Sequence, residues 1–124
     1  MGQLIARLAE ARGDRIVARI DGPEDPAPLE AMDVAIDFSL PEAAFDNISR
    51  CLKAGVPVIS GTTGWLDRYE EAAALCEKIG GAFLYASNFS LGVNLFFELN
   101  KVLARLMDHA PGYEAEIEEI DRKS

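Results

Sequence analysis

Residues 56–65 read VPVISGTTGW, an apolar and β-branched run that stops at Gly61-Thr62-Thr63-Gly64. Runs of this length and composition are typical of buried strands, and glycines that follow such a run are typical of tight turns. Two interpretations of the glycine pair are open at this point. The segment is either a turn that only closes a strand, or a backbone cradle for a cofactor at the start of a helix.

The same change from strand to helix recurs on both sides of this stretch. Short apolar runs predict strands over residues 15–20, 33–38, 56–60 and 82–86. Helical spacing predicts one helix that ends at Gly13, one from the Ser39-Leu40-Pro41-Glu42 capping box to about Ala54, and two more over 66–79 and 91–107. This alternation predicts a doubly wound α/β fold with a mostly parallel sheet. A last alternating stretch, 113–120, predicts an edge strand.

Composition and charge narrow the class of function. The chain has 124 residues, 49% of them hydrophobic, and a net charge of −9. That charge argues against nonspecific binding to nucleic acid or to anionic lipid, because both are polyanions. No apolar run approaches the roughly 20 residues that span a bilayer. Cys51 and Cys76 lie in no metal-binding spacing, which favours reduced thiols, a cytoplasmic location and no metal site.

Ligands of open parallel sheets bind beyond the carboxyl ends of the strands. After the four predicted strands come Asp21-Gly22, Phe38-Ser39, residues 61–64 and residues 87–90, all small or polar enough to suit a nucleotide. A phosphoacceptor receiver domain is an alternative, since Asp37 ends one strand and Thr62 follows the next. A receiver also needs a lysine after a later strand, however, and AFLYA (82–86) is followed by Ser87-Asn88.

Three segments carry a resemblance to a known family. AIDFSLPEA (35–43), AGVPVISGTTGW (54–65) and ASNFSLGVN (86–94), in this order and spacing, resemble 4-hydroxy-tetrahydrodipicolinate reductase, also called dihydrodipicolinate reductase. The resemblance covers essentially the whole chain. It implies a Rossmann-like domain and NAD(P)H-dependent reduction of a cyclic imine dicarboxylate in lysine biosynthesis via diaminopimelate. A non-catalytic nucleotide-binding fragment is the second interpretation.

The resemblance also bears on the two ends of the chain. Met1-Gly2 is similar to the last two residues of the family's glycine-rich loop, so we expect the strand before that loop to be missing. Residues 113–120 are similar to a family strand that leads into a His-His-x-x-Lys segment, whereas Asp121-Arg122-Lys123-Ser124 follows here. We therefore expect a partial dinucleotide-binding domain over 1–112, the start of a truncated substrate and oligomerisation domain over 113–124, no catalytic residue, and an inactive isolated chain.

The resemblance implies a set of cofactor-binding residues. Asp21 would hold the adenosine ribose and favour NADH slightly over NADPH, although Arg19 nearby keeps NADPH possible. The remaining positions run from the glycine loop to the nicotinamide end: Met1, Gly61, Thr62, Thr63, Ala86, Ser87, Asn88 and Phe89. The implied partners are a nicotinamide dinucleotide, a small dicarboxylate substrate and, in the whole enzyme, further copies of the chain in a homo-oligomer.

Overall fold

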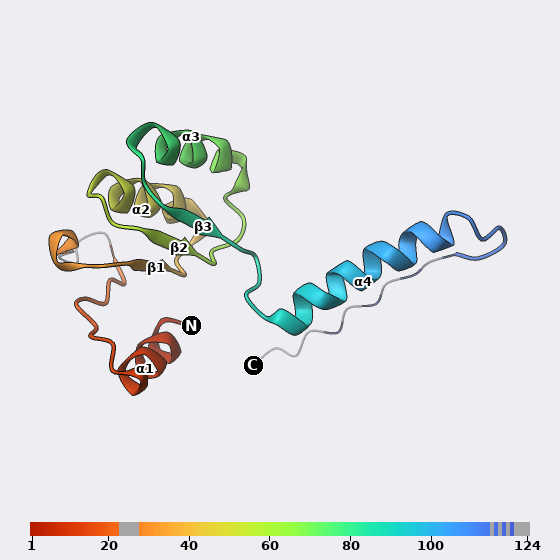
Figure 1. The fold of residues 1–124 in the computed structure, drawn as a ribbon, viewed down its shortest axis with the longest axis horizontal. Helices are drawn as coiled ribbons and strands as arrows, with labels where there is room; N and C mark the ends of the chain where they lie inside the picture. Colours follow the sequence, from red (N-terminus) through yellow and green to blue (C-terminus); the bar gives the residue numbers. More distant parts are fainter. Residues whose placement is uncertain (23–27, 115, 117, 119, 121–124) are drawn as a thin grey trace. The chain divides into compact units, whose positions relative to one another are not determined.

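The computed structural model describes residues 1–22, 28–114, 116, 118 and 120, and forms two units, Met1–Ser87 and Asn88–Ser124. Figure 1 shows the elements of the first unit. They are α1 (Gly2–Arg12), η1 (Leu29–Ala31), β1 (Ala35–Asp37), α2 (Pro41–Lys53), β2 (Val58–Ser60), η2 (Leu66–Arg68), α3 (Tyr69–Ile79) and β3 (Phe83–Tyr85). The second unit contains α4 (Leu91–Met107).

The three strands form one open parallel sheet in the order β1-β2-β3. Ala35, Val58 and Phe83 are in register at one end, and Asp37, Ser60 and Tyr85 are in register at the other. Because side chains alternate along a strand, both of these rows face the same side of the sheet. The predicted α/β class with a parallel sheet is therefore confirmed.

Helices α2 and α3 cover that side of the sheet and enclose the core (Figure 1). Ile48 and Leu52 on α2 and Val58 on β2 are at most 2% exposed, and Trp65 closes the same cluster. On the opposite side, Ile36 and Leu84 are about half exposed, at 49% and 54%. The carboxyl ends of the strands are thus fixed mainly by packing from the α2–α3 side.

The predicted strand over residues 15–20 is wrong, because this segment has no regular secondary structure. A strand is held by the hydrogen bonds of a neighbour. In the part of the chain that the structure describes, the sheet contains only β1, β2 and β3, and β1 pairs with β2 alone. Despite their β propensity, residues 15–20 therefore pair with no neighbouring strand among the described residues.

The predicted capping box at Ser39 is also wrong. The N-cap of α2 is Leu40, one residue later, and its side chain makes no capping hydrogen bond. Pro41 then takes the first helical position, where its fixed φ and missing N–H are tolerated. Ser39 is released from the helix, and its backbone N–H is free to bond to another loop.

In the second unit, α4 matches the predicted range of 91–107 and begins at an N-cap serine, Ser90, whose Oγ accepts from the Val93 N–H. Part of the predicted strand over 113–120, and all of residues 121–124, lie outside the described residues. Those of 113–120 that are described have no regular secondary structure. No helix in the described ranges has the length and apolar character needed to cross a membrane.

Candidate functional site

The candidate site lies at the carboxyl ends of β1, β2 and β3. The register of the sheet aligns Asp37, Ser60 and Tyr85, so the segments after them begin at one edge. The loop after β1 runs over 38–40, the loop after β2 over 61–65, and the segment after β3 begins with Ala86 and Ser87. This edge is where ligands of open parallel sheets bind.

A buried hydrogen-bond network joins the first two of these loops. The Asp37 carboxylate is 8% exposed, and its Oδ2 accepts from Ser60 Oγ at 2.9 Å and from Thr62 Oγ1 at 2.8 Å. Its Oδ1 accepts from Asn47 Nδ2 at 3.3 Å, and that amide also reaches Ser39 Oγ at 3.2 Å. Buried carboxylates need such donors, because an unpaired charge is costly away from water.

Thr62 ties the two loops to each other. Its Oγ1 accepts from the Ser39 backbone N–H at 2.8 Å and donates to Asp37, and the residue is 4% exposed. The hydroxyl of Thr62 is therefore engaged inside the protein. The neighbouring Thr63 is exposed.

Two glycines allow the close approach of these loops. A Cβ on Gly61 would overlap Cε1 and Cζ of the Phe38 ring, so the ring packs directly on the Gly61 backbone. Gly64 has a φ of 81°, a conformation that disfavours side chains, and a Cβ there would lie 3.3 Å from Cγ of Pro41. The glycines of the Gly-Thr-Thr-Gly segment thus have structural requirements of their own.

Trp65 anchors the far end of the same loop. Its indole Nε1 donates to the Thr62 carbonyl at 2.7 Å, and its side chain is 2% exposed. The ring meets Tyr85 edge-on at a centroid distance of 5.6 Å and contacts Phe83 and Tyr69 at 6.0 and 6.1 Å. Trp65 is the only tryptophan of the chain, so its fluorescence reports on this loop alone.

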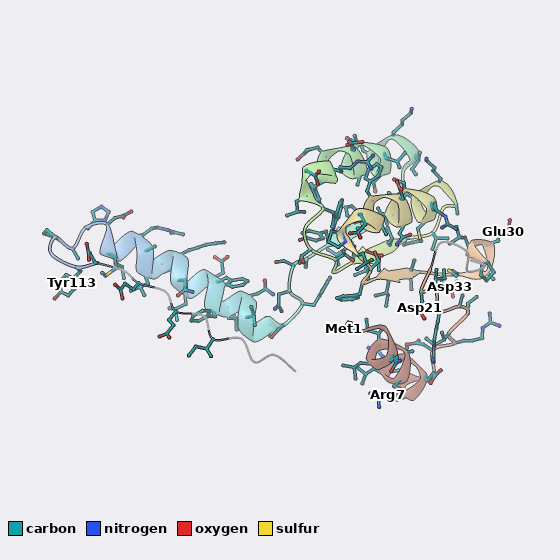
Figure 2. All side chains as sticks on the ribbon, turned by 180° about the vertical axis from the view of Figure 1, so that it is seen from behind. Met1, Arg7, Asp21, Glu30, Asp33 and Tyr113 are labelled. Atoms are coloured by element: carbon teal, nitrogen blue, oxygen red, sulfur yellow. The ribbon has the colours of Figure 1, made fainter. Side chains whose placement is uncertain are left out.

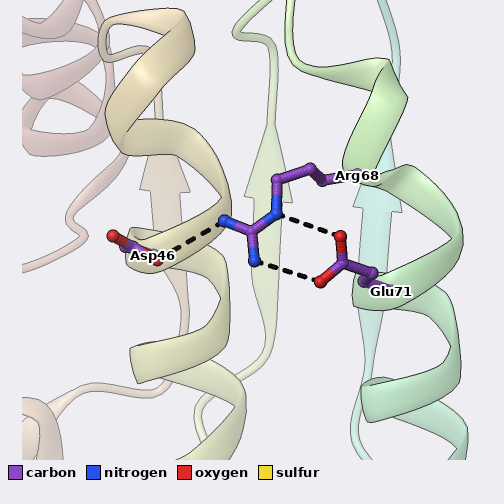
Figure 3. Close-up of polar contacts among 3 residues, drawn as sticks. All are labelled: Asp46, Arg68 and Glu71. Atoms are coloured by element: carbon purple, nitrogen blue, oxygen red, sulfur yellow. Dashed lines mark hydrogen bonds and ion pairs between the residues drawn. The ribbon is translucent and has the colours of Figure 1, made fainter.

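The side chain of Arg68 connects α2 and α3, the helices that follow the first two loops (Figure 3). Its guanidinium forms a two-pronged pair with Glu71 on α3 at 3.0 and 3.1 Å and lies 3.9 Å from Asp46 on α2. It also stacks over the Phe45 ring at 3.4 Å. Hydrogen bonding from Arg68 lowers the pKa of Glu71. A hollow of about 290 Å³ opens beside this group and carries Glu42 and Asp67, which disfavour a phosphate there.

Burial also affects a thiol near the network. Desolvation raises the pKa of Cys51, and the nearby charge of Asp37 raises it further. Cys51 is therefore a neutral thiol in the core and a poor nucleophile. Within the described ranges, no group of three or more His, Cys, Asp or Glu side chains could hold a metal ion.

Comparison with known proteins decides the family. Residues 1–89 match the family model described as dihydrodipicolinate reductase, N-terminus. The chain belongs to this reductase family. A 4-hydroxy-tetrahydrodipicolinate reductase of Christiangramia forsetii is 52% identical over 122 residues, which are 97% of this chain and 51% of that protein. The reductase of Chromobacterium violaceum is 43% identical over 98 residues, 78% of this chain and 35% of that protein.

A third reductase of the same name, from Methanopyrus kandleri, is 40% identical over 94 residues, 73% of this chain and 33% of that protein. The chain thus spans between a third and about half the length of these relatives. The resemblance seen in the three sequence segments is confirmed, and the match covers the whole sheet with its loops.

The structure brings together some of the residues that the reductase resemblance singles out. Gly61, Thr62 and Thr63 lie in one loop of the first unit, and the backbone N–H of Ala86 donates to the Ser60 carbonyl as the last bond of the sheet. Ser87 follows it and is exposed.

The other four predicted positions are Met1, Asp21, Asn88 and Phe89. Figure 2 labels Met1, 71% exposed at the N-cap of α1, and Asp21, exposed in the segment after α1. Asn88 and Phe89 belong to the second unit. There, Asn88 Oδ1 accepts from the Ser90 N–H at 2.8 Å, and Asn94 Nδ2 donates to the Asn88 carbonyl at 3.0 Å. The side chain of Asn88 thereby shapes the turn that begins α4.

Sequence reasoning missed the residues that hold this edge together. Ser60 and Asn47 were not singled out, and Asp37 was considered only as a receiver phosphoacceptor. Its burial and three hydrogen-bond donors favour a structural carboxylate over one that meets a phosphodonor. A signal was present, because the two strands at the centre of the network end in polar residues, Asp37 and Ser60, where an apolar run would otherwise continue.

Proposed function

We propose that this chain forms the nicotinamide-binding part of an NAD(P)H-dependent reductase. The whole protein would reduce the cyclic imine of 4-hydroxy-tetrahydrodipicolinate in lysine biosynthesis. The observation that carries this proposal is the chemical character of the edge. Segments 38–40, 61–65 and 86–87 contain no charged residue, and Asp37, which ends the strand before the first of them, is 8% exposed.

An uncharged polar edge suits one end of a dinucleotide in particular. The reduced nicotinamide ring and its carboxamide are neutral, and the ribose offers only hydroxyl groups. Exposed backbone and hydroxyl groups of Thr63 and Ser87 can bond to these groups without a charged partner. The pyrophosphate, by contrast, needs N–H groups of a helix start or basic side chains. By family resemblance, that part would meet the start of α1 at Met1.

In this proposal, the protein contributes position and environment to the reaction. The bound dinucleotide would supply the hydride. Gly61 and Thr63 would line the nicotinamide ribose, while Ala86 and Ser87, with Asn88 and Phe89, would contact the carboxamide end. Thr62 would act by shape and through its backbone, because its hydroxyl is occupied by Asp37 and Ser39.

Asp21 supports a preference for NADH. A carboxylate there would accept from the ribose 2′-hydroxyl and would repel a 2′-phosphate. Arg19, the nearby cation that could attract such a phosphate, forms an ion pair with Glu10 at 3.1 Å. That pair is exposed on both sides, so it would compete only weakly with a ligand.

The remaining expectations extend to the whole protein. We propose that residues 113–124 begin the substrate and oligomerisation domain and that residues 1–112 belong to the cofactor domain. Catalytic groups would then lie in the substrate domain, so the isolated chain would bind cofactor without turning over substrate. The homo-oligomer and the cytoplasmic location stay predictions.

Titration of the 124-residue chain with NADH and NADPH tests the proposal. Because nicotinamide absorbs where tryptophan emits, binding at this edge should quench Trp65 and sensitise the cofactor. Calorimetry gives the same affinity without an optical probe. Saturable binding of either cofactor supports the proposal, and failure of both to bind would refute it for this chain.

Substitution of Asp21 tests the cofactor preference. Asp21→Asn removes the charge at nearly constant size, so the NADH to NADPH affinity ratio should fall by about tenfold, given the strength of charged hydrogen bonds. Asp33→Asn, at another exposed aspartate of the first unit, controls for net charge and should leave the ratio unchanged. Equal ratios in both variants would contradict the role of Asp21.

A further inference from the structure

The Asp37 network is more elaborate than a strand end requires. Asp37 accepts hydrogen bonds from two consecutive residues of the loop after β2. Its backbone carbonyl accepts from the Gly61 N–H at 2.9 Å, and its carboxylate accepts from the Thr62 hydroxyl at 2.8 Å. Ser60 adds a second hydroxyl donor at 2.9 Å and accepts weakly from the Thr62 N–H at 3.4 Å.

The direction of each proton in this network follows from the donors present. The Ser39 backbone N–H can only donate, so Thr62 Oγ1 is the acceptor in that bond. Thr62 must then direct its own proton elsewhere, and Asp37 Oδ2 lies 2.8 Å away. The order is therefore Ser39 N–H to Thr62 O–H to Asp37, and each bond fixes the next.

The other side of Thr62 is fixed as well. Its carbonyl accepts from the indole N–H of Trp65 at 2.7 Å, and that indole is held by the aromatic cluster of the core. Thr62 is thus held through both its side chain and its backbone. These hydrogen bonds of Thr62 therefore fix the orientation of the exposed residues next to it, Thr63 and Gly64.

We propose that Asp37 is a positioning residue for the nicotinamide-side loop: acting through Thr62 and Ser60, it holds residues 61–64 in the conformation that meets the ligand. This inference rests on the proposed function, since it concerns the same edge. It assigns Asp37 no contact with the cofactor. The loss of its hydrogen bonds should therefore weaken the nicotinamide end of the ligand selectively.

Two matched pairs of variants test the proposal while sparing Asp37 itself, whose replacement could unfold the chain. Thr62→Val removes the hydroxyl at constant shape, and Thr62→Ser restores a hydroxyl without the methyl group. Ser60→Ala removes a hydroxyl that bonds to Asp37, whereas Ser49→Ala removes one that is also buried but has no hydrogen-bond partner among the described residues.

The affinities of each variant for NADH and for ADP form the first readout. Thr62→Val and Ser60→Ala should weaken NADH by about tenfold, because fewer molecules hold a competent loop. Binding of ADP, which lacks the nicotinamide half, should stay within about twofold in every variant. Ser49→Ala should bind NADH within about threefold of the unchanged chain, and Thr62→Ser should recover most of the affinity that Thr62→Val loses.

Amide hydrogen exchange of residues 61–64 without ligand forms the second readout. Exchange should be faster in Thr62→Val and Ser60→Ala, and unchanged in Ser49→Ala. If the unchanged chain binds NADH and Thr62→Val binds it equally well, the inference is overturned and the proposed function stands. Equal losses for NADH and ADP also overturn it, since they indicate general destabilisation.

A chain that binds neither cofactor refutes the proposed function, and the exchange readout then decides the inference alone. Faster exchange confined to 61–64 in Thr62→Val supports a positioning role. Exchange unchanged from the original chain refutes it.

Discussion

Replacing Gly61 with alanine is the most direct test of how the two loops fit together. The new Cβ would overlap Cε1 and Cζ of Phe38 and lie 3.0 Å from Cδ1. Phe38 is 39% exposed, so its ring can swing toward solvent instead of forcing the backbone apart. The variant should therefore fold, with the Phe38 ring displaced.

The cost follows from the burial that the ring loses. Full burial of a phenylalanine side chain contributes about 1.5–3 kcal/mol, and overpacking costs about 1–3 kcal/mol. With about three-fifths of the ring buried, we expect Gly61→Ala to lower the free energy of unfolding by about 1–2 kcal/mol. In a unit of this size, that corresponds to a fall in Tm of about 4–8 °C per kcal/mol.

A double-mutant cycle separates this contact from a general effect of the substitution. Phe38→Ala alone should cost about 1–2 kcal/mol, for the same lost burial. Because the clash disappears with the ring, the double variant should be about as stable as Phe38→Ala, and the two effects should not add. Urea unfolding followed by Trp65 fluorescence measures all three, since Trp65 lies in the same unit.

Gly2→Ala serves as the control, since a Cβ there meets nothing within 4 Å. Its effect should stay within about 0.5 kcal/mol, as is usual for surface positions. A stable Gly61→Ala variant, or a double variant in which the two losses add fully, would refute the packing of Phe38 on Gly61.

Three further results are expected. Burial raises the pKa of the Cys51 thiol from its ordinary value of 9.0, so the stability contributed by the neutral thiol is present below that pH and is lost as the pH rises above it. Cys51→Ala should therefore flatten the fall in urea midpoint above about pH 9. Arg68→Ala should raise the pKa of Glu71 toward its ordinary value, as measured by NMR titration, and Arg68→Lys should restore the low value only in part. Gly64→Ala should cost about 1–2 kcal/mol in the free energy of unfolding, because its φ of 81° disfavours a side chain; a neutral result would show that the loop relaxes.

Much of the fold can be predicted from local sequence. The strands β1, β2 and β3 lie inside the predicted runs, and α4 has the predicted bounds. Local composition suffices for these elements because apolar periodicity determines which face of a helix or strand becomes buried. The same reasoning gave a strand over 15–20, and it failed there because strand formation depends on a neighbour that local sequence does not describe.

The sequence by itself determined the α/β class, the parallel strands and the edge where their loops gather, since these depend on patterns that repeat within a few residues. Only the tertiary structure decided what holds that edge. Asp37 and Thr62 are 25 positions apart, and Thr62 is a hydrogen-bond anchor because parallel pairing puts Ser60 opposite Asp37. Spacing along the chain does not encode such a contact, because it exists only once the sheet register is set.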